Sequence, residues 1–143
     1  MRALESAKSR LREEGLTCVL CKGEQTYTST QRGVKPLVTW LESNLDFHGC
    51  SAADKVVGRA TAFLYVLLGA RALYAHVISR PALEVLRNAG IYVEYEQAVP
   101  YIINRKGDGI CPFEAAVLDM EEPSLAYEAI RNKMKQMKLD IVP

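Results

Sequence analysis

Long apolar runs are missing from this sequence of 143 residues. The uncharged run at residues 60–70 is well short of the roughly 20 apolar residues that a membrane-spanning helix requires. Residues 1–15 carry many charges and lack the apolar segment of a secretory signal peptide. We therefore expect a cytoplasmic protein that does not enter the membrane.

An excess of charge of one sign is also missing. The chain has 18 Lys and Arg against 17 Asp and Glu, a formal net charge of +1, whereas nucleic-acid-binding domains are usually strongly basic. With 49% hydrophobic and 24% charged residues, the composition is that of an ordinary globular protein. These values predict one domain over residues 1–143, with a single core and no nucleic-acid partner.

Cysteine and histidine are few, with four and two residues. Cys18 and Cys21 have the C-x-x-C spacing of metal and redox sites, but they lie in a β-like run, where residues three apart face opposite sides. His48 and Cys50 have no second pair of ligands at suitable spacing, and His76 lies in a different β-like run. We therefore expect free thiols, no metal site and no cofactor.

The hydrophobic periodicity predicts a layered α/β fold with a mixed sheet. We expect a helix over residues 1–14, a hairpin of strands at 16–21 and 25–30, and a helix from Pro36 to about residue 43. The strand at 72–79, the helix at 80–89 and the strand at 91–96 form a βαβ unit, which favours parallel strands. A further strand at 99–103 and a C-terminal helix at about 124–137 complete the prediction.

Residues 51–70 form the most apolar part of the chain, and we expect them to form one buried central helix. Val56, Ala60, Phe63 and Leu67 recur at helical spacing along this stretch. Two residues at its head, Lys55 and Gly58, are unfavourable there, because a lysine faces the positive end of the helix dipole and a glycine destabilises a helix by about 1 kcal/mol relative to alanine.

Two interpretations explain the head of this predicted helix. In the structural one, Ser51 is the N-cap, Asp54 completes a capping box, Lys55 is solvated and Gly58 allows a close approach of another element. In the functional one, the carboxylate of Asp54 and the ammonium of Lys55 meet a small polar ligand in a pocket.

The turn at residues 104–114 contains a second candidate site. Cys111 is expected to be the N-cap of a helix that runs to residue 118, with Pro112 at its first position and Glu114 in its first turn. A helix N-terminus and nearby cations such as Arg105 stabilise thiolates, so we expect Cys111 to be more reactive than an ordinary cysteine. In the alternative interpretation, Cys111 is a small buried turn residue and Glu114 only complements the helix dipole.

The segments DKVVGRA, AHVIS, GIYVEYE and NRKGDGICPFE resemble a small prokaryotic family, domain of unknown function 1893, over about residues 15–119. The fold of this family resembles that of cytidine deaminases, which implies a mixed sheet with helices on both faces. In deaminases a zinc-binding His-x-Glu motif opens the helix that here is expected to begin with residues 52–55, and Pro-Cys-x-x-Cys opens the next one. Neither motif is present, because residues 79–83 read Ser-Arg-Pro-Ala-Leu.

The resemblance therefore implies the location of a pocket without the zinc chemistry. The residues expected to line it are Asp54, Lys55, Ser79, Arg105, Cys111 and Glu114. Our leading hypothesis is a protein that binds a small polar, nucleotide-like ligand without a metal. One alternative is an enzyme with Cys111 as nucleophile, Lys55 or Arg105 as electrostatic partner, and Asp54 or Glu114 transferring protons. Another is a structural or regulatory homodimer with a vestigial pocket.

Overall fold

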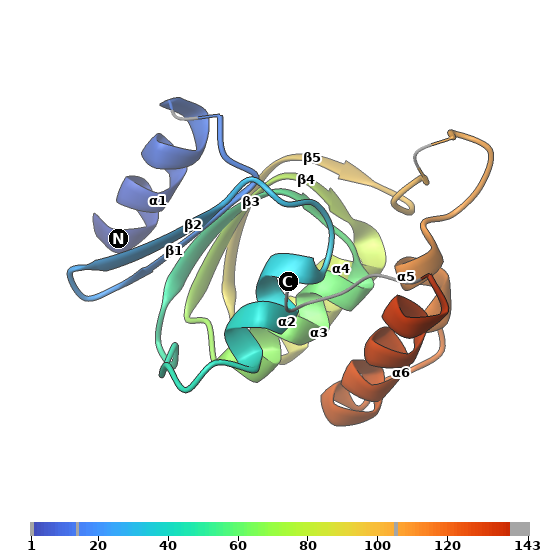
Figure 1. Cartoon of the computed structure of the whole chain (residues 1–143). Coiled ribbons are helices and arrows are strands. Elements are labelled where there is room, and N and C mark those ends of the chain that lie inside the picture. The colour runs from blue at the N-terminus through green and yellow to red at the C-terminus, as the bar shows by residue number, and fades with distance from the viewer. Residues whose placement is uncertain (1, 14, 105, 138–143) are drawn as a thin grey trace.

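The computed structural model describes residues 2–13, 15–104 and 106–137, which form six helices and five strands (Figure 1). In chain order the elements are α1 (Arg2–Glu13), β1 (Cys18–Lys22), β2 (Gln25–Ser29), α2 (Lys35–Leu41), β3 (Ser51–Val57), α3 (Arg59–Leu68), β4 (Ala72–Ser79), α4 (Arg80–Asn88), β5 (Tyr92–Val99), α5 (Pro112–Ala116) and α6 (Pro123–Gln136).

The strands form one mixed sheet in the order β2-β1-β3-β4-β5. β1 is antiparallel to both β2 and β3, whereas β3, β4 and β5 are parallel to one another. The predicted hairpin and the predicted parallel βαβ unit are therefore confirmed. Because β3, β4 and β5 run in one direction, their carboxyl ends meet at one edge of the sheet, the usual place for ligands in open α/β sheets.

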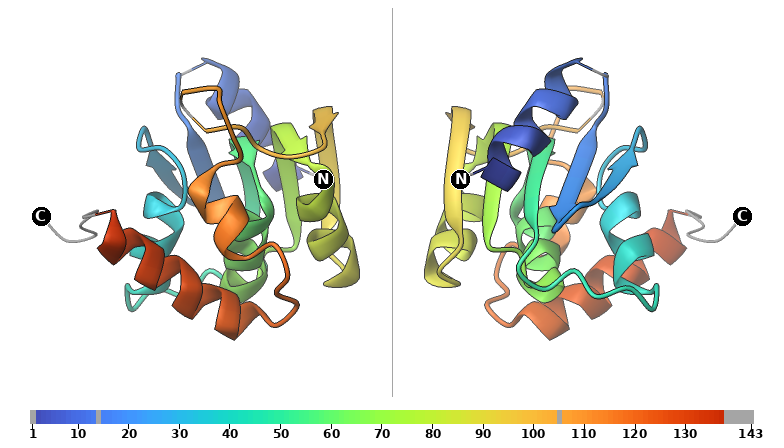
Figure 2. Two further views of the ribbon diagram at one scale, coloured as in Figure 1. Left: turned by 90° about the vertical axis from the view of Figure 1, so that its right-hand side faces the viewer. Right: turned by 90° about the vertical axis from the view of Figure 1, so that its left-hand side faces the viewer.

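Helices cover both faces of the sheet, as expected. α1 lies on one face, and α2 to α6 lie on the other (Figures 1 and 2). Leu4 and Leu11 of α1 pack with Val19 and Ala53 of the sheet in the smaller apolar cluster. The larger cluster lies between the sheet and the remaining helices and is centred on the buried side chains of α3.

The prediction of one helix over residues 51–70 was wrong. The first seven of these residues form β3, and α3 begins at Arg59, with Gly58 as an extended N-cap residue. β3 is paired on both sides, with Leu20 of β1 opposite Ala52 and Leu73 of β4 opposite the same residue. A strand covered on both faces has a nearly continuous apolar sequence, so its periodicity does not distinguish it from a buried helix.

This difference changes the interpretation of several residues. Ser51 and Asp54 do not form a capping box, and Lys55 lies in a strand instead of a first helical turn. Val56 and Leu67, expected in the buried row, are 46% and 37% exposed. The prediction of a buried helix is confirmed for the second half of the stretch, where Phe63, Leu64 and Tyr65 are at most 2% exposed.

Smaller differences occur towards the C-terminal part. The prediction of a separate strand at 99–103 was wrong. β5 itself extends to Val99, and Ile103 forms only an isolated bridge with Ile110. α5 is shorter than the helix expected up to residue 118. α6 agrees with the expected C-terminal helix to within one residue at each end.

The geometric expectation for the C-x-x-C pair is confirmed. Cys18 belongs to the larger apolar cluster and Cys21 to the smaller one, on the other face of the sheet. In residues 2–13, 15–104 and 106–137, no helix is long and apolar enough to cross a membrane.

Candidate functional site

A cavity of about 420 Å³ lies beside the carboxyl end of β3, and we name it the Asp54 cavity. It is bounded by β1, the segment before α2, the start of α3 and the segment around α5. Its polar lining includes Cys18, Asp54, Lys55, Thr61, Cys111 and Glu114. Apolar walls come from Val34, Pro36, Val56, Ile102 and Phe113.

Asp54 is the buried acid of this cavity, with 7% of its surface exposed. Its Oδ2 accepts a 2.7 Å hydrogen bond from the hydroxyl of Tyr65 in α3, and its Oδ1 accepts a 3.3 Å hydrogen bond from the backbone N–H of Val56. Burial disfavours the charged carboxylate and raises the pKa of Asp54 to about 7, although the hydrogen bond from Tyr65 opposes the rise.

Cys18 extends this contact into a chain of three polar side chains. Its Sγ lies 3.1 Å from the hydroxyl of Tyr65. When Asp54 is ionised, the single hydroxyl proton of Tyr65 is donated to it, and the thiol of Cys18 is then the donor to Tyr65. Burial raises the pKa of both Cys18 and Tyr65 well above their ordinary values, so these two groups remain protonated at neutral pH.

This arrangement makes Asp54 the group suited to proton exchange. A carboxyl with a pKa near 7 is present in both protonation states at neutral pH, and can therefore donate or accept a proton or a hydrogen bond. Cys18 and Tyr65 hold the carboxyl in place. Sequence analysis did not identify either residue as part of the site. A hydroxyl within the apolar run of residues 60–70 is the signal for Tyr65.

Glu114 is buried at the cavity wall, where it has a structural role. Its Oε1 accepts a 3.1 Å hydrogen bond from the backbone N–H of Ile102, and its Oε2 accepts one from the backbone N–H of Arg59, the first residue of α3. The carboxylate thus satisfies an otherwise free N–H at the start of α3, where Gly58 offers no side chain. A Cβ on Gly58 would lie 2.6 Å from Oε2, so glycine is required for this contact.

Arg59, which sequence analysis did not single out, connects α3 to the segment after α5. It is 5% exposed, and its Nε donates to the carbonyl of Val117 at 3.2 Å. Its Nη2 donates to the carbonyl of Met120 and to Glu121. These contacts, with those of Glu114, hold the α5 segment against α3 and so form one wall of the cavity.

The other predicted site residues are distributed unevenly. Cys111 is half-buried at the N-cap position of α5 and lines the Asp54 cavity together with Lys55, which is exposed. Ser79 is the N-cap of α4, where its Oγ accepts a 3.3 Å hydrogen bond from the N–H of Ala82, and it does not line this cavity. Arg105 lies outside the described residues.

The expected position of the deaminase motif also needs correction. The resemblance placed the start of the motif-bearing helix at residues 52–55, but that helix begins after Gly58, so Asp54 and Lys55 lie on the strand before it. Across the described part of the chain, no three His, Cys, Asp or Glu side chains gather closely enough to hold a metal ion.

Comparison with known proteins agrees with the fold. The chain is similar to a DUF1893 family protein (TM1506) from Thermotoga maritima, known from a crystal structure, with 29% sequence identity and a TM-score of 0.82. The similarity covers 94% of this chain and 90% of that one. No curated protein matches the chain. The family model described as domain of unknown function DUF1893 matches residues 6–134, and the chain therefore belongs to the DUF1893 family.

Proposed function

We propose that this protein binds a small polar ligand in the Asp54 cavity. The observation that carries the proposal is the carboxyl of Asp54, which is buried and held by Tyr65 at a cavity with mostly apolar walls. A volume of about 420 Å³ is within the range of small-molecule sites. An apolar pocket with a few fixed polar groups orients a ligand through those groups.

The chemistry of the cavity favours a flat, partly polar molecule. Val34 and Phe113 offer apolar surface to its ring, and Asp54 can hydrogen-bond to its polar edge as donor or acceptor. Lys55 and Arg32 add exposed cations at the rim, where an anionic group would be favoured. The resemblance to cytidine deaminases, which is itself a prediction, makes nucleobases and nucleosides the first compounds to test.

The experiment is a thermal-shift and calorimetric titration with a panel of free nucleobases and nucleosides. We expect at least one compound to raise the melting temperature of the wild-type protein, because binding to the folded state stabilises it. Asp54→Asn should abolish the effect. Glu84→Gln, which changes an exposed carboxylate of α4 outside the cavity, is the matched control and should retain it. Equal responses of both variants would contradict the proposal.

A second candidate function is an enzyme with Cys111 as nucleophile. The half-buried thiol of Cys111 lines the same cavity as the proton-exchanging carboxyl of Asp54, and Lys55 is at the rim. In this case Cys111→Ser would abolish turnover of a bound ligand without abolishing its binding, whereas Asp54→Asn would affect both. Turnover that persists in Cys111→Ser would exclude the nucleophilic role.

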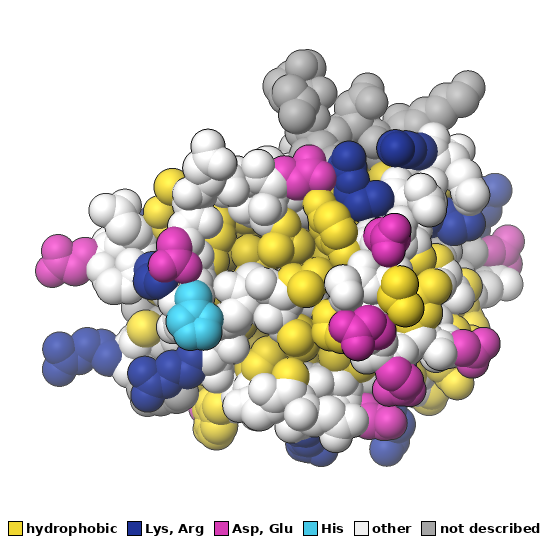
Figure 3. Space-filling view, turned by 90° about the horizontal axis from the view of Figure 1, so that it is seen from below, with side chains coloured by type: hydrophobic (Ala, Val, Ile, Leu, Met, Phe, Trp, Pro, Cys, Tyr) yellow, Lys and Arg dark blue, Asp and Glu magenta, His cyan; other side chains and the backbone are white. Residues whose placement is uncertain are grey.

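The third hypothesis is a homodimer with a vestigial pocket. Apolar side chains gather across the middle of one face in the space-filling view (Figure 3). Leu45 and Leu67, which border one shallow hollow, are 51% and 37% exposed. Light scattering measures the molecular mass of the wild-type protein and of Leu67→Glu in solution. A dimer held by this apolar contact would give a dimeric mass for the wild type and a lower mass for Leu67→Glu. A monomeric mass for the wild-type protein would exclude the dimer.

A further inference from the structure

A second cavity, of about 560 Å³, lies on the opposite face of the sheet, beside α1. We name it the α1-face cavity. It is lined by Arg12 of α1, Lys55 of β3, Tyr74 and His76 of β4, and Glu96 of β5, together with two further residues of the α1 region. Of the described residues that were expected to line the Asp54 cavity, only Lys55 also lines this one.

The register of the sheet explains why three of these residues lie together. Val56 is opposite Val77, and Val77 is opposite Gln97, so the residues one position earlier form a neighbouring row. This row is Lys55, His76 and Glu96, with His76 in the middle. It lies towards the carboxyl ends of three parallel strands, where ligands commonly bind in α/β sheets.

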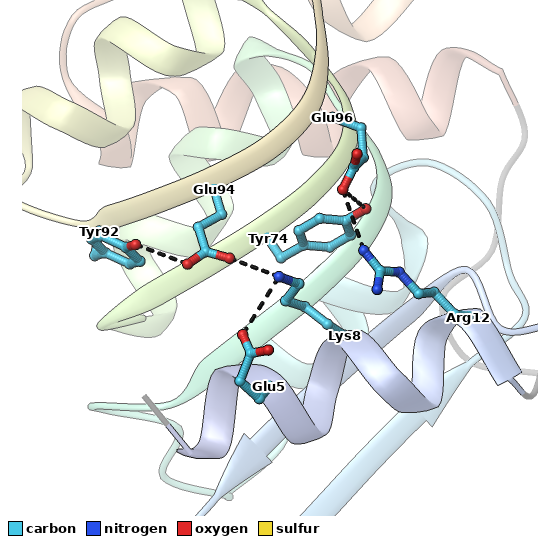
Figure 4. A network of polar contacts seen from close by, with 7 residues as sticks. All are labelled: Glu5, Lys8, Arg12, Tyr74, Tyr92, Glu94 and Glu96. Atoms are coloured by element: carbon cyan, nitrogen blue, oxygen red, sulfur yellow. Dashed lines mark hydrogen bonds and ion pairs between the residues drawn. The ribbon is translucent and has the colours of Figure 1, made fainter.

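Several charged side chains of α1 and β5 on this face are paired with one another (Figure 4). Lys8 contacts Glu94 at 2.9 Å and Glu5 at 3.4 Å. Arg12 contacts Glu96 at 3.3 Å, and the hydroxyl of Tyr74 donates to the same carboxylate at 3.0 Å.

Two side chains of the row, those of Lys55 and His76, are not paired in this way. Lys55 and His76 are exposed, and among the described residues neither side chain has a hydrogen bond or an ion pair. The carboxylate of Glu96 is balanced by Arg12, so the ammonium of Lys55 is a surplus positive charge at the cavity. The imidazole of His76 adds a hydrogen-bond donor beside it.

We propose that Lys55, His76 and Arg12 form a binding site for a small oxyanion of the phosphate type. Lys55 supplies a point charge, and the imidazole of His76 supplies an N–H donor. Arg12 keeps its contact with Glu96 and provides further donors, since a guanidinium has five N–H groups. Among the described lining residues, Tyr74 and Glu96 are the other titratable groups besides Lys55 and Arg12, and they hold Arg12 at the mouth of the site.

The sequence supplies an internal control for the test. The chain has two histidines, and His48 lies in the segment before β3, away from the α1-face cavity. Proton NMR resolves histidine ring protons, and the variants His48→Gln and His76→Gln assign the two signals. Sulfate is the probe, because it remains a dianion across the pH range used. Sodium chloride keeps the ionic strength constant.

At pH 6.5, we expect sulfate to move the ring-proton signal of His76 and to leave the signal of His48 unmoved. Lys55→Met should reduce this movement at least threefold, whereas Lys135→Met, which removes an exposed lysine of α6, should not change it. Equal movement of both histidines, or no effect of Lys55→Met, would overturn the proposal. Methyl phosphate and inorganic phosphate are titrated in the same way. The compound that moves the His76 signal at the lower concentration shows whether the site prefers a phosphate monoester or the free ion.

Discussion

The hydroxyl of Tyr65 donates a 2.7 Å hydrogen bond to the carboxyl of Asp54 and joins α3 to β3 at the floor of the Asp54 cavity. Both residues are buried, and Asp54 is adjacent in sequence to the exposed Lys55. Because side chains alternate along a strand, Asp54 points towards α3, whereas the exposed Lys55 lies near the carboxyl end of β3 and lines both the Asp54 cavity and the α1-face cavity. The carboxyl end of β3 therefore contributes to a cavity on each face of the sheet.

Tyr65→Phe removes the hydroxyl that holds Asp54. The hydrogen bond lowers the pKa of Asp54, so its loss should raise that pKa above about 7. We expect the free energy of unfolding to fall by about 1–3 kcal/mol at pH 8, where the carboxylate is charged, and by less at pH 5. Urea denaturation at both pH values measures this. Tyr92→Phe, which removes an exposed hydroxyl, is the control. The same loss at both pH values would show that the hydrogen bond does not depend on the charge of Asp54.

Asp54 should also make stability depend on pH. Its pKa in the folded state, about 7, is above the ordinary value of 3.8, so the folded state binds this proton more tightly than the unfolded state. The contribution of Asp54 is therefore complete below about pH 4 and is lost as the pH rises to about 7. Between about pH 4 and pH 7, we expect the wild-type protein to lose ~2–4 kcal/mol of unfolding free energy relative to Asp54→Asn. Parallel pH profiles would show that the carboxyl titrates normally.

Gly58 should not accept a side chain. A Cβ there would lie 2.6 Å from Oε2 of Glu114 and 3.1 Å from Ile102, so the carboxylate that caps α3 would be displaced. We expect Gly58→Ala to destabilise the protein by about 1–3 kcal/mol and Gly58→Leu to prevent correct folding. Thermal unfolding measures the effect. Gly109→Ala, whose added Cβ meets nothing closer than 3.6 Å, is the matched control. An unchanged melting temperature for Gly58→Leu would exclude this packing.

Cys111 should react first with an alkylating agent. It is half-buried at the cavity, whereas Cys18, Cys21 and Cys50 are at most 5% exposed. Mass spectrometry after brief treatment of the native protein with iodoacetamide should find modification at Cys111 before the other three. Lys55→Met should slow this reaction, since it removes a cation from the same cavity. Equal modification of all four cysteines would mean that the cavity does not expose Cys111.

The sequence predicted most elements of the fold, because the hairpin, the βαβ unit and the terminal helices have strong periodic or turn signals. It did not separate β3 from α3, because the mostly buried β3 has no clear alternation of polar and apolar residues that would distinguish it from the buried helix α3. Asp54 and Cys111 were nevertheless assigned to one pocket, through the family resemblance. Tyr65 and Arg59 were missed because their roles depend on partners 11 and 55 to 62 residues away in sequence, which only the fold brings together.

The central claim is that the Asp54 cavity is a ligand site. The most direct measurement is a crystal structure of the protein after soaking with free nucleobases and other small planar amides, in the wild type and in Asp54→Asn. We expect density for a compound between the apolar walls, with a polar atom within hydrogen-bonding distance of the carboxyl of Asp54, in the wild type only. Compounds bound elsewhere on the protein in the same crystals, with the cavity unchanged, would contradict the claim.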